Sequence, residues 1–216
     1  MGTRVKVDQV VVGEQLTSLR RQPVQQRSAL RVARMLDSAA ELVDEVGYEA
    51  LTTTQIAKRA GVAVGSLYQF FPDKRAVVQA LTQRNLERFM SMAAERMAAV
   101  DHQHWWDVVD ALLDIYLQMH RETPGFGRVH FGDVVDPTLL DGSKTNNAVV
   151  AEGITALLTG RLDLPAEQVT TPITLAVEAA DALLKLAFRT DPKGDPVVLD
   201  ETKHLIKVYL ESRFGQ

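Results

Sequence analysis

The stretch LTTTQIAKRAGVAVGSLYQFFPDKRAVVQAL, residues 51–81, decides the fold of this chain. Thr52 and Gln55 have the spacing of a capping box, which marks the start of a helix, and Gly61 ends that helix soon afterwards. A second short helix is expected from Val64 to Phe70. Two short helices joined by a turn that contains glycine form a helix-turn-helix pattern, in which the second helix enters the major groove of DNA.

Helical periodicity continues on both sides of this stretch. Apolar residues recur every three or four positions, and charged residues occupy the opposite face. Gly47 follows the first such segment, at the position where a helix end favours a left-handed residue. We expect an all-α fold of about nine helices, with short helical pieces and loops at 126–145 and longer helices at 28–46, 74–100, 104–121, 146–161, 166–189 and 197–213.

The composition is that of an ordinary globular protein, but the charge is unevenly distributed. The 216 residues include no cysteine, which excludes a disulfide scaffold, a cysteine nucleophile and cysteine-based zinc or iron–sulfur sites. Residues 1–75 carry 11 Lys and Arg against 8 Asp and Glu, whereas residues 76–216 carry 13 against 20. A basic first third suits contact with a polyanion. The sequence has no apolar run of transmembrane length and no signal-peptide core, so a cytoplasmic location is expected.

The second helix of the motif would present a row of side chains to DNA. Gln69 can form two hydrogen bonds with adenine, Ser66 can reach a base or a phosphate, and Val64 can contact a thymine methyl group. Tyr68 can donate its hydroxyl to a phosphate. The residues expected to point outward are Val64, Gly65, Ser66, Tyr68, Gln69 and Phe70.

Lys74 stands at the start of the next predicted helix, directly after Asp73. A cation at that place opposes the helix dipole. Two interpretations remain open. Lys74 is either a solvated lysine beside a compensating aspartate, or it holds a phosphate together with the amides of the helix N-terminus.

Residues from about 28 to 80 closely resemble the DNA-binding region of the tetracycline-repressor (TetR) family. The resemblance rests on Gly47, Tyr48, Thr53, Thr54, Ile56, Ala57, Ala60, Gly61, Val62, Gly65, Leu67, Tyr68, Phe71 and Lys74. Members of that family are dimeric transcription regulators, usually repressors. The resemblance therefore implies a flexible arm at 1–26, a three-helix DNA-binding domain at 27–75, and a ligand-binding and dimerisation domain at 76–216.

The resemblance also assigns contacts with operator DNA. It adds Thr53 and Thr54 at the start of the first motif helix, and it places Tyr68 and Lys74 where family members contact phosphates. The complete expected DNA-binding set is Thr53, Thr54, Val64, Gly65, Ser66, Tyr68, Gln69, Phe70 and Lys74.

Two positions depart from the family pattern. Ala63 stands where a Ser or Thr cap is common, and Val64 stands where a polar residue is frequent. Both reduce readout by hydrogen bonds, so the half-site sequence is not predicted. In the arm, Arg20, Arg21 and Arg27 either reach a neighbouring minor groove or belong to a solubilising tail.

The family architecture implies a cavity in the C-terminal domain. Aromatic and Met side chains at helical spacing there are either plain core or, in part, cavity lining. We expect an apolar or aromatic small-molecule effector held by one or two polar anchors. The candidate ligand-binding residues are Phe89, Trp105, Trp106, Tyr116, Met119, His120, Phe126, His130, Phe131, Glu178 and Asp181.

Glu178 and Asp181 are candidate anchors because they are three residues apart and share one helix face. Three interpretations of Asp181 remain open: part of a solvated stripe, a hydrogen bond at a dimer interface, or an anchor for a cationic ligand. His102 and His104 have zinc-ligand spacing but no companion ligands, so a polar cluster at a helix start is favoured, and no metal or cofactor is predicted.

Apolar stripes on the last two predicted helices indicate a homodimer, which would place two recognition helices about one DNA turn apart on a pseudo-palindromic operator. Effector binding would then move the helix at 74–100 and change that spacing. The alternative is a regulator controlled by a partner protein, with a filled core in place of a cavity. A helical enzyme is disfavoured because the sequence contains no catalytic motif.

Overall fold

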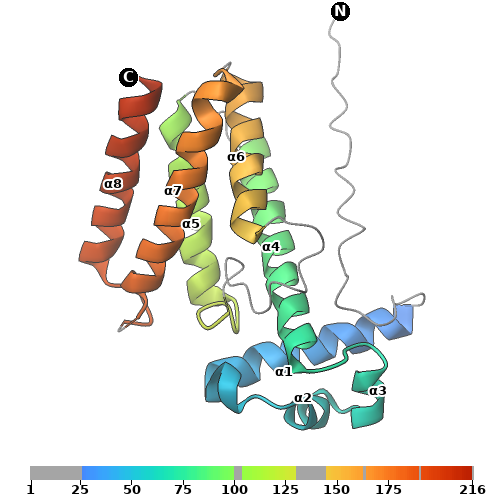
Figure 1. The fold of residues 1–216 in the computed structure, drawn as a ribbon. Helices are drawn as coiled ribbons and strands as arrows, with labels where there is room; N and C mark the ends of the chain where they lie inside the picture. The colour runs from blue at the N-terminus through green and yellow to red at the C-terminus, as the bar shows by residue number, and fades with distance from the viewer. Residues whose placement is uncertain (1–25, 100–103, 130–144, 163, 190, 216) are drawn as a thin grey trace, which may run out of the picture.

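A computed structural model of the chain describes residues 26–99, 104–129, 145–162, 164–189 and 191–215. This part of the chain is all-helical, as predicted, and its helices form a small head below a larger bundle (Figure 1). The helices are α1 (Gln26–Ala50), α2 (Thr53–Ala60), α3 (Val64–Tyr68), α4 (Lys74–Ala99), α5 (Trp105–Glu122), α6 (Asn146–Leu162), α7 (Ala166–Ala187) and α8 (Pro196–Phe214).

The head consists of α1, α2, α3 and the first turns of α4. The predicted capping box is confirmed, because the Thr52 hydroxyl accepts from the Gln55 backbone N–H and the Gln55 side chain accepts from the Thr52 backbone N–H. Gly47 interrupts the helical backbone of α1 at φ 74°, which suits glycine. The core of the head includes Met35, Ile56 and Phe71, all fully buried.

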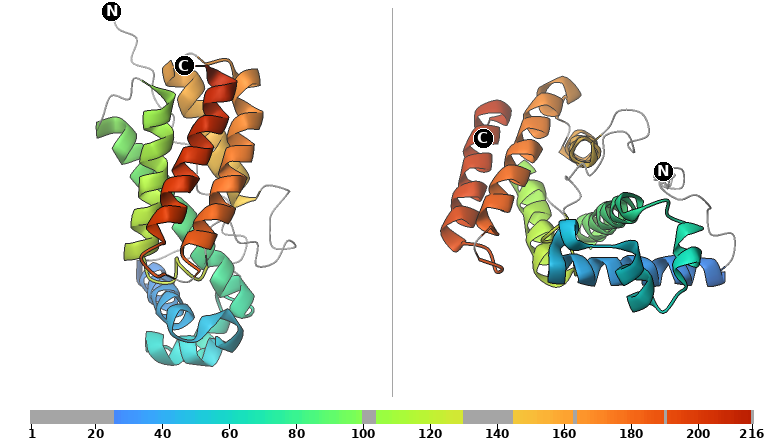
Figure 2. Two further views of the ribbon diagram at one scale, coloured as in Figure 1. Left: turned by 90° about the vertical axis from the view of Figure 1, so that its left-hand side faces the viewer. Right: turned by 60° about the horizontal axis from the view of Figure 1, so that its bottom comes forward.

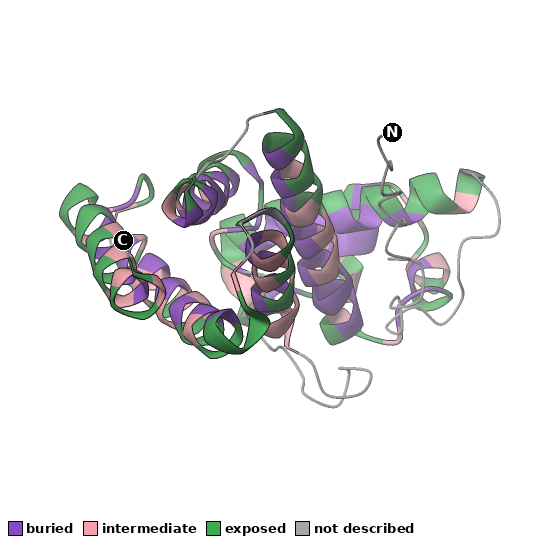
Figure 3. Ribbon diagram, turned by 90° about the horizontal axis from the view of Figure 1, so that it is seen from above, coloured by how far each residue is buried: buried purple, intermediate pink, exposed green. Residues whose placement is uncertain are grey.

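The bundle consists of α5 to α8 and the remainder of α4. Figure 3 shows the buried faces of these helices turned toward one another. Its core includes Phe126, Leu158 and Ile173, each at most 1% exposed. The two cores meet within α4, because Leu81 belongs to the core of the head and Leu86 to that of the bundle. The predicted domain division at residues 75 and 76 stays a prediction.

The head and the bundle are also joined at the end of α5. Asp44 of α1 accepts a hydrogen bond of 2.7 Å from the backbone N–H of Gly125, and Val129 is buried in the core of the head. Gly125 has a φ of 78°, and a Cβ atom there would lie 2.9 Å from the Cα atom of Ala40. A second link is the ion pair of 2.6 Å between Arg84 of α4 and Asp37 of α1.

Eight helices are found among the described residues, close to the expected number of about nine. The long helices begin and end within a few residues of their predicted limits. The short helical pieces predicted at 126–145 fall largely at 130–144, outside the described residues, as does the predicted arm except for its last residue. Within the described part of the chain, no helix has the length and apolar character needed to cross a membrane.

Candidate nucleic-acid interface and internal cavity

Helices α2 and α3 form the predicted helix-turn-helix. Gly61 lies between them in the left-handed conformation, at φ 65° and ψ 38°, and caps the end of α2. Ala57 and Ala60 of α2 are buried with Leu67 of α3, so small side chains permit a close approach of the two helices. The motif is packed under α1 and the start of α4 (Figures 1 and 2).

The outer edge of this motif carries most of the predicted DNA-binding residues. Gly65 and Tyr68 of α3 and Gln69, which directly follows the helix, are exposed, and Val64 and Ser66 are half-buried. On α2, Thr54 is exposed and Thr53 is half-buried. A Cβ atom at Gly65 would meet no heavy atom within 4 Å, so nothing in the described part of the head requires glycine there. A glycine without a packing reason suits close approach of another molecule.

Tyr68 and Thr53 are joined by a hydrogen bond of 3.0 Å between their hydroxyl oxygens. This bond connects α3 to the first turn of α2, although the two residues are far apart on the motif. It fixes the Tyr68 ring at the edge of the motif, where the Tyr68 hydroxyl can accept a hydrogen bond from Thr53 and donate one to a phosphate. The sequence did not predict this hydrogen bond, because the two residues are 15 positions apart and meet only when α2 and α3 have packed.

The expected outward orientation of Phe70 is wrong. Phe70 is 5% exposed and belongs to the core of the head. Helix α3 ends at Tyr68, two residues earlier than predicted, so the backbone turns and carries the Phe70 ring inward. Ala63 precedes α3 without a side-chain hydrogen bond, as its departure from the family pattern suggested.

Lys74 has a role that neither sequence interpretation included. Its ammonium donates hydrogen bonds to the backbone oxygens of Tyr48 and Glu49, at 3.1 and 3.0 Å, and lies 4.6 Å from the centre of the Tyr48 ring. These carbonyls belong to the last residues of α1, where a cation is favourable. Lys74 therefore fastens the end of α1 to the start of α4. The cap of α4 is Asp73, whose carboxylate accepts from the Ala76 N–H.

Arg59 is another basic residue of the head that is already engaged. It binds Glu45 of α1 through two hydrogen bonds of 2.6 and 2.7 Å. The Arg59 side chain thereby lowers the pKa of the Glu45 carboxyl, and Glu45 raises the pKa of Arg59. Arg59, one of the basic residues counted in the first third of the sequence, therefore holds α2 against α1.

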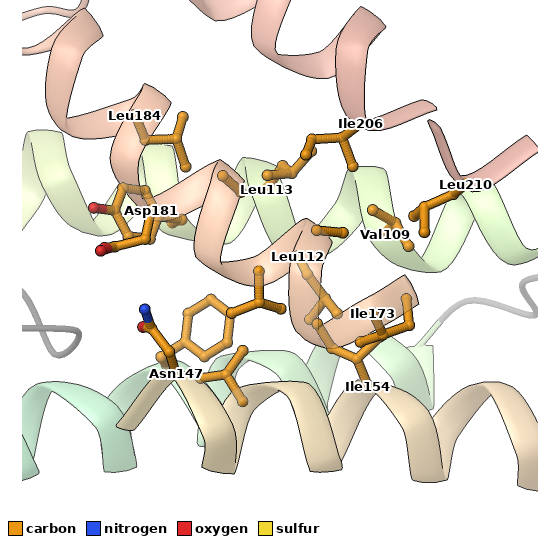
Figure 4. Close-up of a pocket in the computed structure, with 16 residues that line it drawn as sticks. Val109, Leu112, Leu113, Asn147, Ile154, Ile173, Asp181, Leu184, Ile206 and Leu210 are labelled. Atoms are coloured by element: carbon orange, nitrogen blue, oxygen red, sulfur yellow. The ribbon is translucent and has the colours of Figure 1, made fainter. Parts of the chain in front are cut away.

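A cavity of about 70 Å³ lies inside the bundle between α4, α5, α6, α7 and α8 (Figure 4). Its walls are almost wholly apolar, and its polar residues are Asp181, Asn147 and Tyr116. The remaining lining consists of Phe89, Val109, Leu112, Leu113, Val150, Ile154, Ile173, Ala176, Val177, Ala180, Leu184, Ile206 and Leu210. Most of these aliphatic residues were not singled out in the sequence, since nothing local separates cavity lining from plain core.

Three predicted ligand-binding residues line this cavity, namely Phe89, Tyr116 and Asp181. The prediction is not met by six residues that lie outside the lining, namely Trp105, Trp106, Met119, His120, Phe126 and Glu178. Among the described residues, no methionine lines the cavity. Their surroundings explain this. The ring of Trp105 packs on Phe214, and the rings of Phe126 and His120 pack together at the far end of α5. His130 and Phe131 lie outside the described residues.

Asp181 and Asn147 lie at the same end of the cavity (Figure 4). One carboxylate oxygen of Asp181 pairs with Lys185 at 2.9 Å, and the other is buried and has no hydrogen-bond partner within the described part of the chain. Asn147 donates to Glu178 at 3.0 Å, which places Glu178 behind the lining. The Oδ1 atom of Asp181 is thus a buried acceptor with free capacity at the edge of an apolar space.

The outer faces of α7 and α8 expose large apolar side chains. Leu175, Leu205 and Val208 are each about half exposed, at 54%, 49% and 49%. They border an open groove of about 660 Å³ together with His204 and Tyr209. Leu175, Leu205, Val208 and Tyr209 lie on the apolar stripes from which the sequence predicted a dimer.

Comparison with known proteins places both parts of the chain in one group. A family model described as "Bacterial regulatory proteins, tetR family" matches residues 35–81, and one described as "Tetracyclin repressor-like, C-terminal domain" matches residues 103–214. The HTH-type transcriptional repressor KstR of Rhodococcus jostii (strain RHA1) is 41% identical over 61 residues. That match covers 28% of this chain and 29% of the repressor.

Solved structures extend the likeness to most of the chain. A TetR-family transcriptional regulator from Streptomyces coelicolor has 40% sequence identity and a TM-score of 0.73, over 85% of this chain and 99% of that one. A TetR variant from Acinetobacter baumannii AYE in complex with minocycline shares the fold, with 19% identity and a TM-score of 0.56, over 84% of this chain and 97% of that one.

Proposed function

This chain belongs to the TetR family of bacterial regulatory proteins, and from that premise we propose that it is a repressor that binds operator DNA as a dimer and is released by a small molecule. The proposal rests chiefly on one observation: the outer edge of α3 presents Ser66, Tyr68 and Gln69 on a helix that the core of the head holds in place. Operator binding of this kind takes place in the cytoplasm of a bacterium.

We assign the DNA contacts to the exposed edge of the motif. Gln69 and Ser66 reach base edges, Thr54 and Tyr68 reach phosphates, and Gly65 lets the backbone come close to the groove. Phe70 takes no part because it is buried. Lys74 acts by holding α1 against α4, which positions the whole motif.

We assign dimerisation to the exposed apolar faces of α7 and α8. Burying Leu175, Leu205 and Val208 against a second copy would remove them from water. A two-fold arrangement repeats the recognition helix once in each subunit. The operator is therefore expected to be a pseudo-palindrome whose half-sites are separated by whole turns of DNA.

The effector is expected to occupy the cavity in the bundle. Ligand sites commonly measure about 300–1,000 Å³, several times the 70 Å³ enclosed here. Entry of a ligand must therefore push the surrounding helices apart, so binding and movement are coupled by geometry. The free oxygen of Asp181 selects an apolar effector that carries a hydrogen-bond donor, such as a phenol or an amine.

The small size of the cavity also favours one alternative. If the bundle does not expand, the chain is a regulator controlled by a partner protein. The substitution Ala180→Leu decides between the two, because Ala180 lines the cavity and a larger side chain there would fill it. Under the effector proposal, this variant binds the operator and no longer responds to the effector. Under the alternative, its response to cellular control is unchanged.

The DNA proposal is tested by selecting fragments of source genomic DNA with the purified chain and sequencing them. A pseudo-palindromic site is expected to be enriched. The affinity for that site is then measured by fluorescence anisotropy for Gln69→Ala, which should weaken it by about 1–3 kcal/mol. Gln168→Ala, an exposed glutamine on α7, serves as the control. Absence of enrichment after unfolding and refolding to remove bound ligand would overturn the proposal.

A glycine pair separates lost contact from lost folding. Gly65→Ala adds a methyl group to the outer edge of α3, and Gly160→Ala adds one to an exposed position on α6; neither Cβ meets an atom within 4 Å. Both changes should leave the stability equal or slightly higher. Gly65→Ala alone should weaken operator binding. Equal affinities for the two variants would remove Gly65 from the interface.

The effector proposal is tested with a thermal-shift screen of apolar phenols and amines. A compound that raises the melting temperature and releases the operator is then tested against Asp181→Asn, which keeps the shape of the side chain and removes its charge. If the compound is an amine, the affinity of the Asp181→Asn variant for it is expected to be lower than that of the unmodified chain. Glu167→Gln, an exposed change in the first turn of α7, is the control. Unchanged affinity in Asp181→Asn would exclude the carboxylate as the anchor.

A further inference from the structure

A second, polar cleft opens between the head and the bundle. It measures about 480 Å³ and lies where α1, the end of α5 and the end of α7 come together. In the left view of Figure 2, the connection between α7 and α8 and the end of α5 lie directly above α1. The cavity inside the bundle shares no lining residue with this cleft.

Three arginines from two segments line the cleft: Arg121 at the end of α5, Arg128 in the turn that follows, and Arg189 just after α7. All three are exposed, and none forms an ion pair with a carboxylate in the described part of the chain. Arg84 of α4 behaves differently, because it forms an ion pair with the Asp37 carboxylate. The carboxylates of Asp44 and Glu122 also line the cleft, so the three guanidinium groups give its lining an excess of one positive charge.

The geometry of the cleft orients this charge. The Nε atom of Arg121 donates to the backbone oxygen of Lys193 at 3.2 Å, which fixes the side chain and leaves its terminal NH₂ groups available. One wall is formed by His120, whose ring stacks on that of Phe188 with the centres 3.4 Å apart. The arginines are thus set around a defined space.

Both acidic residues of the cleft accept a hydrogen bond from a neutral donor. Asp44 accepts from the backbone N–H of Gly125 at 2.7 Å, and Glu122 accepts from the Gln118 amide at 2.9 Å. The hydroxyl oxygen of Thr123 behaves differently. Thr123 lines the cleft, is 9% exposed, and its buried hydroxyl has no hydrogen-bond partner within the described residues. Thr123 lines the same cleft as the three arginines, and its hydroxyl is a donor without an acceptor in the described part of the chain.

We infer that this cleft is a binding site for a small oxyanion, a phosphate or carboxylate group of a metabolite, distinct from the effector cavity. Guanidinium groups bind such oxyanions through paired N–H···O bonds, and the Thr123 hydroxyl supplies a further donor. The bound group would lie against the arginines on the bundle side of the cleft, because the Asp44 carboxylate on the α1 side would repel an anion. The inference does not depend on the proposed operator or effector.

The test measures the melting temperature of the full chain at constant ionic strength while sodium chloride is replaced by inorganic phosphate, and separately by citrate. Replacement at constant ionic strength cancels general screening. A saturable rise is expected with at least one of the two probes, because a ligand that binds the folded state stabilises it. A rise with phosphate alone identifies a phosphate group as the ligand, and a rise with citrate alone identifies carboxylates.

The double variant Arg128→Gln and Arg189→Gln removes two charges from exposed positions, so folding is expected to be preserved. The half-saturating concentration should rise about tenfold or more, because the oxyanion loses two of its three guanidinium partners. Arg88→Gln, an exposed arginine on α4 away from the cleft, should behave as the unmodified chain. Two results would overturn the site: no saturable rise with either probe, or the same half-saturating concentration in the double variant.

Discussion

Gly125 is expected to be the position where the smallest change does the most damage to the junction between head and bundle. The substitution Gly125→Ala adds one methyl group. Its Cβ atom would lie 2.9 Å from the Cα atom and 3.0 Å from the backbone oxygen of Ala40 in α1. Backbone atoms of a buried helix cannot rotate away, so the turn after α5 must retreat from α1.

The structure gives the size of the effect in two parts. Alanine at a φ of 78° costs about 1–2 kcal/mol, because the left-handed region crowds the Cβ atom. Retreat of the turn also breaks the hydrogen bond of 2.7 Å from the Gly125 N–H to the Asp44 carboxylate, which contributes about 1.5–3 kcal/mol. The free energy of unfolding should therefore fall by about 2.5–5 kcal/mol.

Gly61→Ala is a matched control. Gly61 also has a positive φ, 65°, but a Cβ atom there meets nothing within 4 Å. It should cost about 1–2 kcal/mol, from the backbone conformation alone. Urea denaturation followed by far-ultraviolet circular dichroism, at one fixed chain concentration, measures both variants. Combining Gly125→Ala with Asp44→Ala should cost less than the two single changes together. Equal losses for Gly125→Ala and Gly61→Ala would refute the close approach to α1.

Three further changes test the head. Because Arg59 lowers the pKa of Glu45, their ion pair stabilises the fold above the ordinary glutamate pKa of 4.5, and this stabilisation is lost as the pH falls through the lowered pKa. Glu45→Gln should therefore reduce the loss of stability measured between about pH 5 and pH 3. Lys74→Met should reduce the free energy of unfolding, measured in urea, by about 1–2 kcal/mol, because two carbonyls of α1 lose their donor. An unchanged free energy of unfolding would show that these hydrogen bonds do not stabilise the fold. Tyr68→Phe should weaken operator affinity about three- to tenfold in fluorescence anisotropy, and adding Thr53→Val should cost little more because both changes remove the same hydrogen bond.

The motif could be predicted from the sequence because its signals are local. The capping box of Thr52 and Gln55, the left-handed Gly61 and the Asp73 cap each depend on residues a few positions apart, and all three occur in the structure. The helices of the bundle were predicted for the same reason, since the periodicity of apolar residues follows from one buried face.

What the sequence did not predict is the surroundings of side chains whose neighbours come from distant parts of the chain. Phe70 points inward because α3 ends early and the core of the head lies beside it. Lys74 bonds to carbonyls of α1 that precede it by 25 or 26 residues. Trp105 is as apolar as a cavity residue but packs on Phe214, which lies 109 residues further along the chain. Residue type cannot distinguish such surroundings, because they exist only after the helices have packed.

The cavity and the exposed groove are two sides of one helix pair. Ala176 of α7 and Ile206 of α8 line both spaces, so the wall between them is a single layer of side chains. A ligand that enlarges the cavity pushes on this wall, and α7 and α8 pack on each other as a unit. In a dimer that pairs through the groove, a displacement of α7 and α8 in one subunit would act directly on the second subunit. The spacing of the two recognition helices then changes through the dimer interface as well as through α4, which predicts that Ile206→Val, a change in the shared wall, alters both effector response and dimer dissociation.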